Sequence, residues 1–202
     1  MTLPSVLLAS SSRRRQDFLR ALGIPFQTFA PHVDESLLRG EDPFAAAERL
    51  ARAKASAAAS AAAAAAAGAS DAETLVIAAD TLVVLEGRAL GKPANRADAR
   101  AMLRALSGRR HEVVTGVALV HRGALVSGRD VTEVAFAPLD DPTIGRYVES
   151  GEADDKAGAY ALQGLAGFFI DGIEGSPSNV VGLPVRLLYT LAARLGVDLL
   201  AL

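Results

Sequence analysis

The chain contains no cysteine and no tryptophan, and it has no surplus of basic residues. The absence of cysteine excludes disulfides, thiolate metal sites and a cysteine nucleophile. The 21 basic residues face 23 acidic ones, for a net charge of −2. General nucleic-acid binders and proteins of anionic membrane surfaces carry excess positive charge, so the composition disfavours both classes. We therefore expect no nucleic-acid partner and no membrane partner.

Long hydrophobic runs are also lacking, although 50% of the residues are hydrophobic. The longest apolar run, residues 58–67, is almost pure alanine and too weakly hydrophobic to span a membrane. The N-terminal residues place a short apolar run before basic residues, which is the reverse of the order in a signal peptide. These features predict a soluble cytoplasmic protein.

Lysine is scarce among the basic residues. Only Lys54, Lys92 and Lys156 are lysines, and the rest of the 21 are arginines. This bias suggests a GC-rich coding preference that replaces lysine wherever arginine serves. The three lysines are therefore candidates for positions that need a compact ammonium on a flexible stem.

Apolar runs and helical patterns alternate along the chain. Strands are expected at residues 5–9, 26–30, 74–79, 82–85, 113–120 and 125–136, with Asp80 and Thr81 ending the third and the last two forming a hairpin. Helices are expected at residues 13–22, 43–67, 95–106, 142–149 and 184–195. This order predicts an α/β protein with a mixed central sheet flanked by helices.

No repeat or linker divides the sequence, so we expect one domain over residues 1–202, with room for two lobes around a cleft. Residues 55–70 are low-complexity and rich in alanine, which favours a helix without specifying what it packs against. We interpret this tract as a helical extension. Residues 151–179 are rich in glycine and are expected to form functional loops and a short strand.

A first candidate site joins a predicted strand to a predicted helix, where three serines precede three arginines at residues 10–15. Hydroxyls and unpaired N–H groups at a helix N-terminus can hold an anion. A phosphate would also offset the arginines that face the positive end of the helix dipole. The alternative is a serine N-cap followed by solvated arginines.

A second candidate pair is Lys54 and Asp80. Lys54 shares a helical stripe with Ala47, Ala51 and Ala58, so it either extends along the helix to water or points into a cleft. Asp80 is expected at the end of an apolar strand, where open α/β sheets bind ligands. A carboxylate there can bind Mg²⁺ or orient water, or it can simply form a turn.

The segment of residues 154–164 mixes charged residues, small residues and one amide. The amide of Gln163 could contact the edge of a nucleobase, or it could hold the loop together. Lys156 could pair with Asp154 or Glu152 to order the same loop. Composition does not decide between these alternatives.

Taken in order, eight segments resemble the Maf family of nucleotide pyrophosphatases over nearly the whole chain. They are residues 8–15, 33–35, 53–55, 79–81, 91–93, 102–108, 155–164 and 180–184. Each piece carries little information alone, whereas the ordered set is highly specific. The resemblance implies an α/β fold shared with inosine-triphosphate pyrophosphatases, a divalent metal cofactor (Mg²⁺ or Mn²⁺) and frequent homodimers.

Residues 155–160 together with Gln163 are similar to the branch of that family that hydrolyses dTTP and UTP. The branch that acts on 7-methyl-GTP has glutamate in place of this glutamine. By the same resemblance, Arg14, Thr81 and Gln163 are specificity positions and Asp80 is the proton acceptor.

The resemblance also suggests roles for the remaining polar residues. Glu35 and Asp80 are candidate metal ligands, and Lys156 lies in a family motif without an assigned contact. One departure is Arg13, which stands where the family has a proline that would stiffen the turn. The phosphate contacts are assigned to Ser10, Ser12, Arg15, Lys54 and Lys92.

The expected reaction is hydrolysis of dTTP and UTP to the monophosphate and pyrophosphate. This reaction would remove unwanted nucleoside triphosphates from the nucleotide pool. An alternative enzyme would remove modified or non-standard nucleotides such as 7-methyl-GTP or ITP. An alternative of another class is a regulator of cell division that acts by binding a partner. The presence of Glu35, Lys54, Asp80 and Lys92 favours catalysis, because an inert relative should have lost its charged residues.

Overall fold

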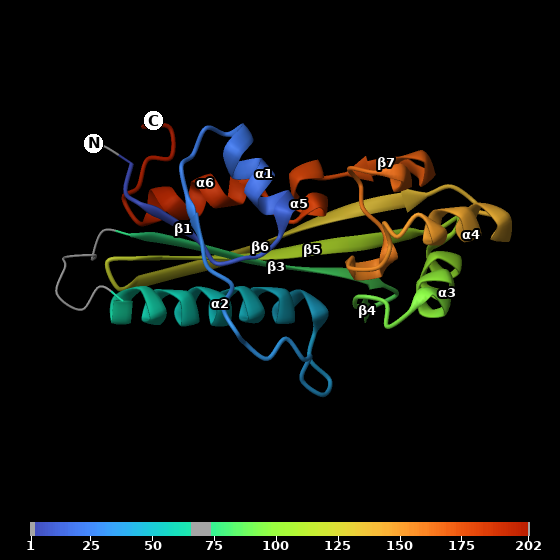
Figure 1. Cartoon of the computed structure of the whole chain (residues 1–202), viewed down its shortest axis with the longest axis horizontal. Helices are drawn as coiled ribbons and strands as arrows, with labels where there is room; N and C mark the ends of the chain where they lie inside the picture. Colours follow the sequence, from blue (N-terminus) through green and yellow to red (C-terminus); the bar gives the residue numbers. More distant parts are fainter. Residues whose placement is uncertain (1–2, 66–73, 202) are drawn as a thin grey trace. The chain divides into compact units, whose positions relative to one another are not determined.

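The computed structural model describes residues 3–65 and 74–201. Within them, a seven-stranded sheet has the order β2-β1-β3-β5-β6-β7, with β4 paired to β3 (Figure 1). Strand β1 is parallel to β2 and β3, whereas β4 and β7 are antiparallel to their neighbours. The sheet is therefore mixed and lies among helices, as predicted. The strands are β1 (Val6–Leu8), β2 (Gln27–Thr28), β3 (Leu75–Leu85), β4 (Arg88–Leu90), β5 (Arg110–His121), β6 (Ala124–Phe136) and β7 (Ile170–Glu174).

The helices follow the predicted order, with short additions in the glycine-rich segment. The α-helices are α1 (Arg13–Ala21), α2 (Pro43–Ala65), α3 (Arg96–Leu106), α4 (Asp141–Glu149), α5 (Pro177–Val181) and α6 (Val185–Arg194). Two 3₁₀ helices, η1 (Ala157–Ala159) and η2 (Leu165–Phe169), precede β7. Within the described ranges, no helix combines the length and the hydropathy that a membrane span requires.

Two compact units make up the chain. Unit 1 contains residues 1–80, 115–130 and 182–202, and unit 2 contains residues 81–114 and 131–181. Strands β3, β5 and β6 each contribute residues to both units.

In unit 1, the apolar residues of β3 alternate between two packed layers. Leu75, Ile77 and Ala79 belong to the cluster that α1 and α6 complete on one face of the sheet. Val76 and Ala78 pack with alanines of α2 on the other face. Figure 1 shows α2 along one side of these strands and α6 along the other. This is the side-chain alternation of a strand that is buried on both faces.

Helix α2 lies unusually close to the sheet. A Cβ atom on Gly116 of β5 would lie 2.3 Å from the carbonyl oxygen of Ala47, so only glycine fits there. Small side chains make this approach possible, and both Ala55 and Ala58 are fully buried. The start of the alanine tract is therefore part of the packed helix face. The predicted helix end at residues 66–67 and the tract from residue 66 onward lie outside the described residues.

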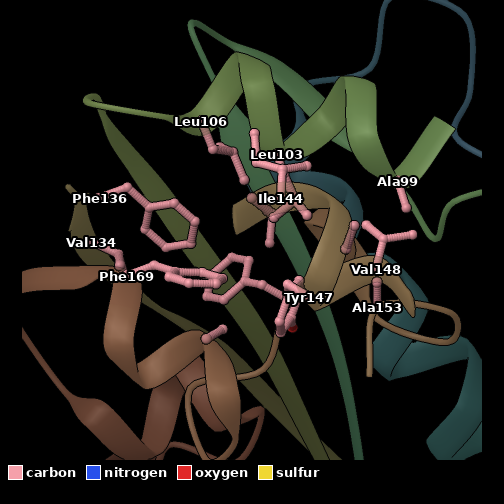
Figure 2. Packing of buried hydrophobic residues seen from close by; sticks show 14 of the residues in the cluster. Ala99, Leu103, Leu106, Val134, Phe136, Ile144, Tyr147, Val148, Ala153 and Phe169 are labelled. Atoms are coloured by element: carbon pink, nitrogen blue, oxygen red, sulfur yellow. The ribbon is translucent and has the colours of Figure 1, made fainter. Parts of the chain in front are cut away.

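Unit 2 is built around a separate core in which α3 and α4 pack with β6 (Figure 2). Leu103 and Leu106 come from α3, Ile144 and Tyr147 from α4, and Phe136 from β6. The helical spacing of the apolar residues in α3 and α4 explains why one face of each helix is buried.

The predicted hairpin of β5 and β6 is confirmed, but the prediction that Asp80 and Thr81 end a strand is wrong. Strand β3 continues through both residues because its last three residues pair with β4. The short β4 has too few residues to show a periodic pattern, so the sequence assigned no strand there. A turn at Glu86 and Gly87 joins β3 to β4, and their φ angles of 51° and 76° suit a tight hairpin.

Candidate active site

Lys54 lies at the centre of a charged cluster in unit 1. Its Nζ atom donates a hydrogen bond to Asp80 Oδ1 at 2.6 Å and lies 2.6 Å from Glu35 Oε1. Lys54 and Asp80 are only 8% and 7% exposed, whereas the side chain of Glu35 is 53% exposed. Lys54 therefore points inward to two carboxylates and does not extend along the helix to water.

The two periodicities of the secondary structure explain why Lys54 and Asp80 meet. Asp80 follows Val76 and Ala78 at intervals of two, which places it on the α2 face of β3. Lys54 shares the buried stripe of α2 with Ala51, one turn away. Strand and helix thus project a carboxylate and an ammonium into the same buried layer. The pairing offsets part of the cost of burying each charge.

The serine–arginine segment forms a second part of the site in the same unit. Ser10 is buried directly after β1, and its Oγ accepts hydrogen bonds from the Ser12 N–H at 3.1 Å and from Arg15 Nη1 at 3.3 Å. Arg15 Nε donates to the Gly182 carbonyl oxygen at 2.7 Å. Ser12 occupies the N-cap position of α1, but its side chain makes no capping hydrogen bond. The serine N-cap alternative is therefore not realised at Ser12.

Arg15 is electrostatically connected to the Lys54 cluster. Burial lowers the pKa of its guanidinium, the Asp80 carboxylate raises it, Arg14 lowers it and Glu35 raises it. Arg14 is half-buried on α1, and Arg13 is exposed at the first helical position. Residue 13 is thus accommodated in the helix without the proline of the family pattern.

Arg49 of α2 braces the segment that carries Glu35. Its Nε and Nη2 donate to the two carboxylate oxygens of Glu41 at 2.6 and 2.7 Å, and Nη2 also donates to the Ser36 carbonyl oxygen at 3.1 Å. Glu41 further accepts the Leu38 N–H at 3.0 Å. These hydrogen bonds lower the pKa of Glu41 to about 2, that from Arg49 contributing most. Sequence reasoning missed Arg49, because no local signal indicates which loop acid an arginine contacts.

Lys92 lies in unit 2, on the Gly-Lys-Pro turn that follows β4. The Gly158 N–H donates to the Gly91 carbonyl oxygen at 3.0 Å, which joins this turn to the glycine-rich loop. Gly158 has a φ of 68°, and a Cβ there would lie 2.9 Å from Val83. Both constraints require glycine at this position. The Lys92 side chain is exposed.

Lys156 is also in unit 2, and its predicted partners are wrong. Its ammonium pairs with Asp155 rather than with Asp154 or Glu152. Glu152 is engaged elsewhere, because it accepts a hydrogen bond from Tyr147 Oη at 3.0 Å. Partner choice among neighbouring acids depends on the three-dimensional course of the loop, which composition does not encode.

The structure thus gathers part of the predicted site directly. Thr81 follows Asp80 on β3 and is half-buried, and Gln163 is exposed in the loop of unit 2. The residues brought together in unit 1 are Ser10, Arg15, Glu35, Lys54 and Asp80.

The carboxylates of the cluster bear on whether a divalent cation can bind here. Among residues 3–65 and 74–201, no three histidine, aspartate or glutamate side chains group as a metal site. Glu35 and Asp80 nevertheless converge on one ammonium. Magnesium in nucleotide sites is usually held by one or two carboxylates, together with substrate phosphates and water. Glu35 and Asp80 therefore supply oxygen ligands of the type that Mg²⁺ takes.

A mixed α/β sheet with a serine–arginine junction and a buried Lys–Asp pair defines a class of enzyme suited to nucleotide phosphate chemistry. The chain belongs to the Maf family: the family model described as Maf-like protein matches residues 5–195. The resemblance seen in the sequence is confirmed.

Curated relatives match almost from end to end. The dTTP/UTP pyrophosphatase of Symbiobacterium thermophilum is 45% identical over 194 residues, covering 96% of this chain and 95% of that protein. The dTTP/UTP pyrophosphatase of Anaeromyxobacter dehalogenans strain 2CP-1 is 46% identical over 201 residues, covering 97% and 96%. The solved Ham1 protein of Staphylococcus aureus aligns at a TM-score of 0.50 and 17% identity, covering 95% of this chain and 98% of that chain. That likeness concerns the fold alone.

Proposed function

We propose that this protein hydrolyses dTTP and UTP to the nucleoside monophosphate and pyrophosphate. The observation that carries the proposal is the position of Lys54 Nζ, 2.6 Å from an oxygen of Asp80 and 2.6 Å from an oxygen of Glu35. The names of the curated relatives, at about 45% identity, support the choice of substrate.

The reaction must overcome the charge of the triphosphate. Water attacks the α-phosphorus, the bond from that phosphorus to the α–β bridging oxygen breaks, and pyrophosphate leaves with the bond electrons. Asp80 accepts the proton of the attacking water. Lys54 holds the Asp80 carboxylate in place through their 2.6 Å hydrogen bond, so the base is already oriented.

Positive groups stabilise the charge that develops on the departing pyrophosphate. Arg15 is fixed by Gly182 and Ser10, which limits the number of orientations that its guanidinium can take. The proposed phosphate contacts are Ser10, Ser12, Arg15, Lys54 and Lys92.

Selection of the base is assigned to Thr81, Gln163 and Arg14. The hydroxyl of Thr81 and the amide of Gln163 each offer a donor and an acceptor, which suits the edge of a pyrimidine. A site that forms such hydrogen bonds rejects bases without the matching groups, because its own polar groups then lose their partners.

A divalent metal, Mg²⁺ or Mn²⁺, belongs to the same proposal. Glu35 and Asp80 would hold it, and when bound it would neutralise phosphate charge. Homodimeric assembly and a cytoplasmic location are further expectations. Light scattering of the purified protein and fractionation of cells test them.

The proposal is tested by incubating the purified protein with dTTP, UTP, 7-methyl-GTP and ITP. We expect pyrophosphate and the monophosphate from dTTP and UTP, at a higher kcat/KM than from the two purine nucleotides. A preference for 7-methyl-GTP or ITP would instead favour the enzyme for modified or non-standard nucleotides. If the folded protein hydrolysed none of the four, the proposal would fail and the partner-binding alternative would gain support.

A further inference from the structure

We infer that Glu152 is a positioning residue that sets the pyrimidine selectivity of Gln163 by anchoring the loop that carries it. The inference rests on the proposed function, because it concerns how that same site distinguishes one base from another. Glu152 carries no assigned role in the sequence patterns, where it is only one possible partner of Lys156.

The Glu152 carboxylate gathers three hydrogen bonds from the loop and from the core. Oε2 accepts the Leu165 N–H at 2.9 Å, and Oε1 accepts the Ala166 N–H at 3.3 Å. Tyr147 Oη donates to Oε1 at 3.0 Å. One side chain thus satisfies two successive backbone N–H groups directly after the Gln163–Gly164 pair. Hydrogen bonds to a charged acceptor are stronger than neutral ones.

Gly164 shows how tightly the carboxylate is packed against this loop. A Cβ atom on Gly164 would lie 2.2 Å from Glu152 Oε2, so no other residue fits without moving one of the two. The Gly164 N–H also donates to the Ala161 carbonyl oxygen at 3.2 Å, which closes a turn around Gln163. The backbone on both sides of Gln163 is therefore fixed, although its side chain is exposed.

The anchor is itself rooted in the core of unit 2. Tyr147 is 3% exposed and packs edge to face with Phe169, the last residue of η2, with ring centroids 5.1 Å apart. Burial, followed by the charge of Glu152 and the hydrogen bond to it, raises the pKa of Tyr147, which therefore stays protonated and can donate. A chain of contacts thus runs from the core through Tyr147 and Glu152 to the loop that carries Gln163.

This geometry predicts a specific kinetic effect. Gln163 can distinguish bases only if its amide is presented in one orientation, since donor and acceptor exchange places when the amide rotates. Loosening the loop weakens contacts to the base more than contacts to the triphosphate. The cost therefore falls on the nucleotides that use those contacts.

The test uses Glu152→Gln, which keeps the size but replaces one accepting oxygen with an NH₂ group. We expect kcat/KM for dTTP and UTP to fall about tenfold, mainly through KM, while kcat/KM for ITP changes by less than about threefold. The matched control is Glu149→Gln, three residues away, which removes an exposed pair with Arg100 and should leave selectivity unchanged.

A double-mutant cycle with Gln163→Ala separates positioning from general stability. If Glu152 acts through Gln163, Glu152→Gln should have little further effect on selectivity in the Gln163→Ala background. Additive effects, or an equal loss for all nucleotides, would overturn the inference. So would unchanged selectivity in Glu152→Gln when Gln163→Ala alters it.

Two further measurements keep the test decisive. If Glu152→Gln does not fold, Tyr147→Phe removes the tyrosine hydroxyl, which donates to Glu152 and accepts from the Ala161 backbone, and should shift selectivity in the same direction by a smaller factor. An unshifted ratio in that folded variant would overturn the inference. Failure of the wild-type protein on dTTP and UTP overturns the proposed function instead, so the two failures are distinguishable.

Discussion

Lys54 Nζ and Asp80 Oδ1 lie 2.6 Å apart, and both side chains are buried, although the two residues are 26 positions apart in the sequence. The same ammonium lies 2.6 Å from Glu35. One compact ammonium therefore contacts two carboxylates. A guanidinium is wider and planar, so it could not take the same position between them.

Lys54→Arg keeps the charge and should still reduce activity. The guanidinium is wider than an ammonium and would displace Glu35 or Asp80 from their present positions. We expect kcat/KM for UTP to fall about tenfold or more, measured by pyrophosphate release. Lys92→Arg should also reduce it markedly. Arg52→Lys, on the exposed side of α2, serves as the control. Full activity in both Lys54→Arg and Lys92→Arg would show that neither position requires lysine.

Asp80→Asn tests the proton acceptor. The amide is nearly the same size and can still accept the Lys54 hydrogen bond, so fold and nucleotide binding should persist. It cannot take a proton from water, and we expect kcat to fall about 100-fold or more. Single-turnover hydrolysis and calorimetric nucleotide binding measure the two properties separately. If Asp80→Asn kept the wild-type turnover, Asp80 would not be the proton acceptor. Asp17→Asn, in an exposed pair with Arg20, is the control.

Arg49→Lys should weaken the site without touching substrate. Lysine cannot reproduce the paired bonds to Glu41 together with the bond to the Ser36 carbonyl, so the segment carrying Glu35 loosens. We expect Mn²⁺ affinity, measured by electron paramagnetic resonance, to fall roughly tenfold, as for other residues that orient metal ligands. Unaltered Mn²⁺ affinity would limit Arg49 to a structural role. Arg52→Lys again provides the comparison.

The order of elements and the family were accessible from the sequence because both depend on local patterns. Periods of two and of about 3.6 also place Asp80 and Lys54 on facing surfaces, once β3 is known to pack on α2. The bond from Arg15 to Gly182 was not accessible, since the two residues are 167 positions apart and no local signal connects them. The continuation of β3 through Asp80 and Thr81 depends on β4, whose three residues show no pattern.

Gly116→Ala tests the close packing of α2 on β5. The added methyl group would lie 2.3 Å from the Ala47 carbonyl oxygen, and this neighbour is backbone that cannot rotate away. We expect the free energy of unfolding to fall by at least about 2 kcal/mol. Urea denaturation measures it. Gly172→Ala, where nothing lies within 4 Å of the added atom, should be nearly neutral, and equal stabilities of the two variants would contradict the packing argument.

His111 should make stability depend on pH in a defined window. It is 1% exposed, its Nε2 lies 2.8 Å from Tyr160 Oη, and burial lowers its pKa from 6.5 to about 4. Between these two pH values, His111 therefore binds a proton in the unfolded chain but not in the folded chain. The contribution of His111 to the free energy of unfolding is fully present above pH 6.5, and it falls by roughly 3 kcal/mol as the pH drops toward 4.

Urea denaturation of the wild type and of His111→Gln from pH 7.5 to 4.5 measures this contribution as the difference between the two slopes. Glutamine does not titrate, so the variant should lose less stability across the window even if it is less stable at pH 7.5. Carboxylates affect both proteins equally and cancel in the difference. His32→Gln, which replaces an exposed histidine, serves as the control for the substitution itself. Parallel slopes for wild type and His111→Gln would show that His111 is protonated without cost to the fold.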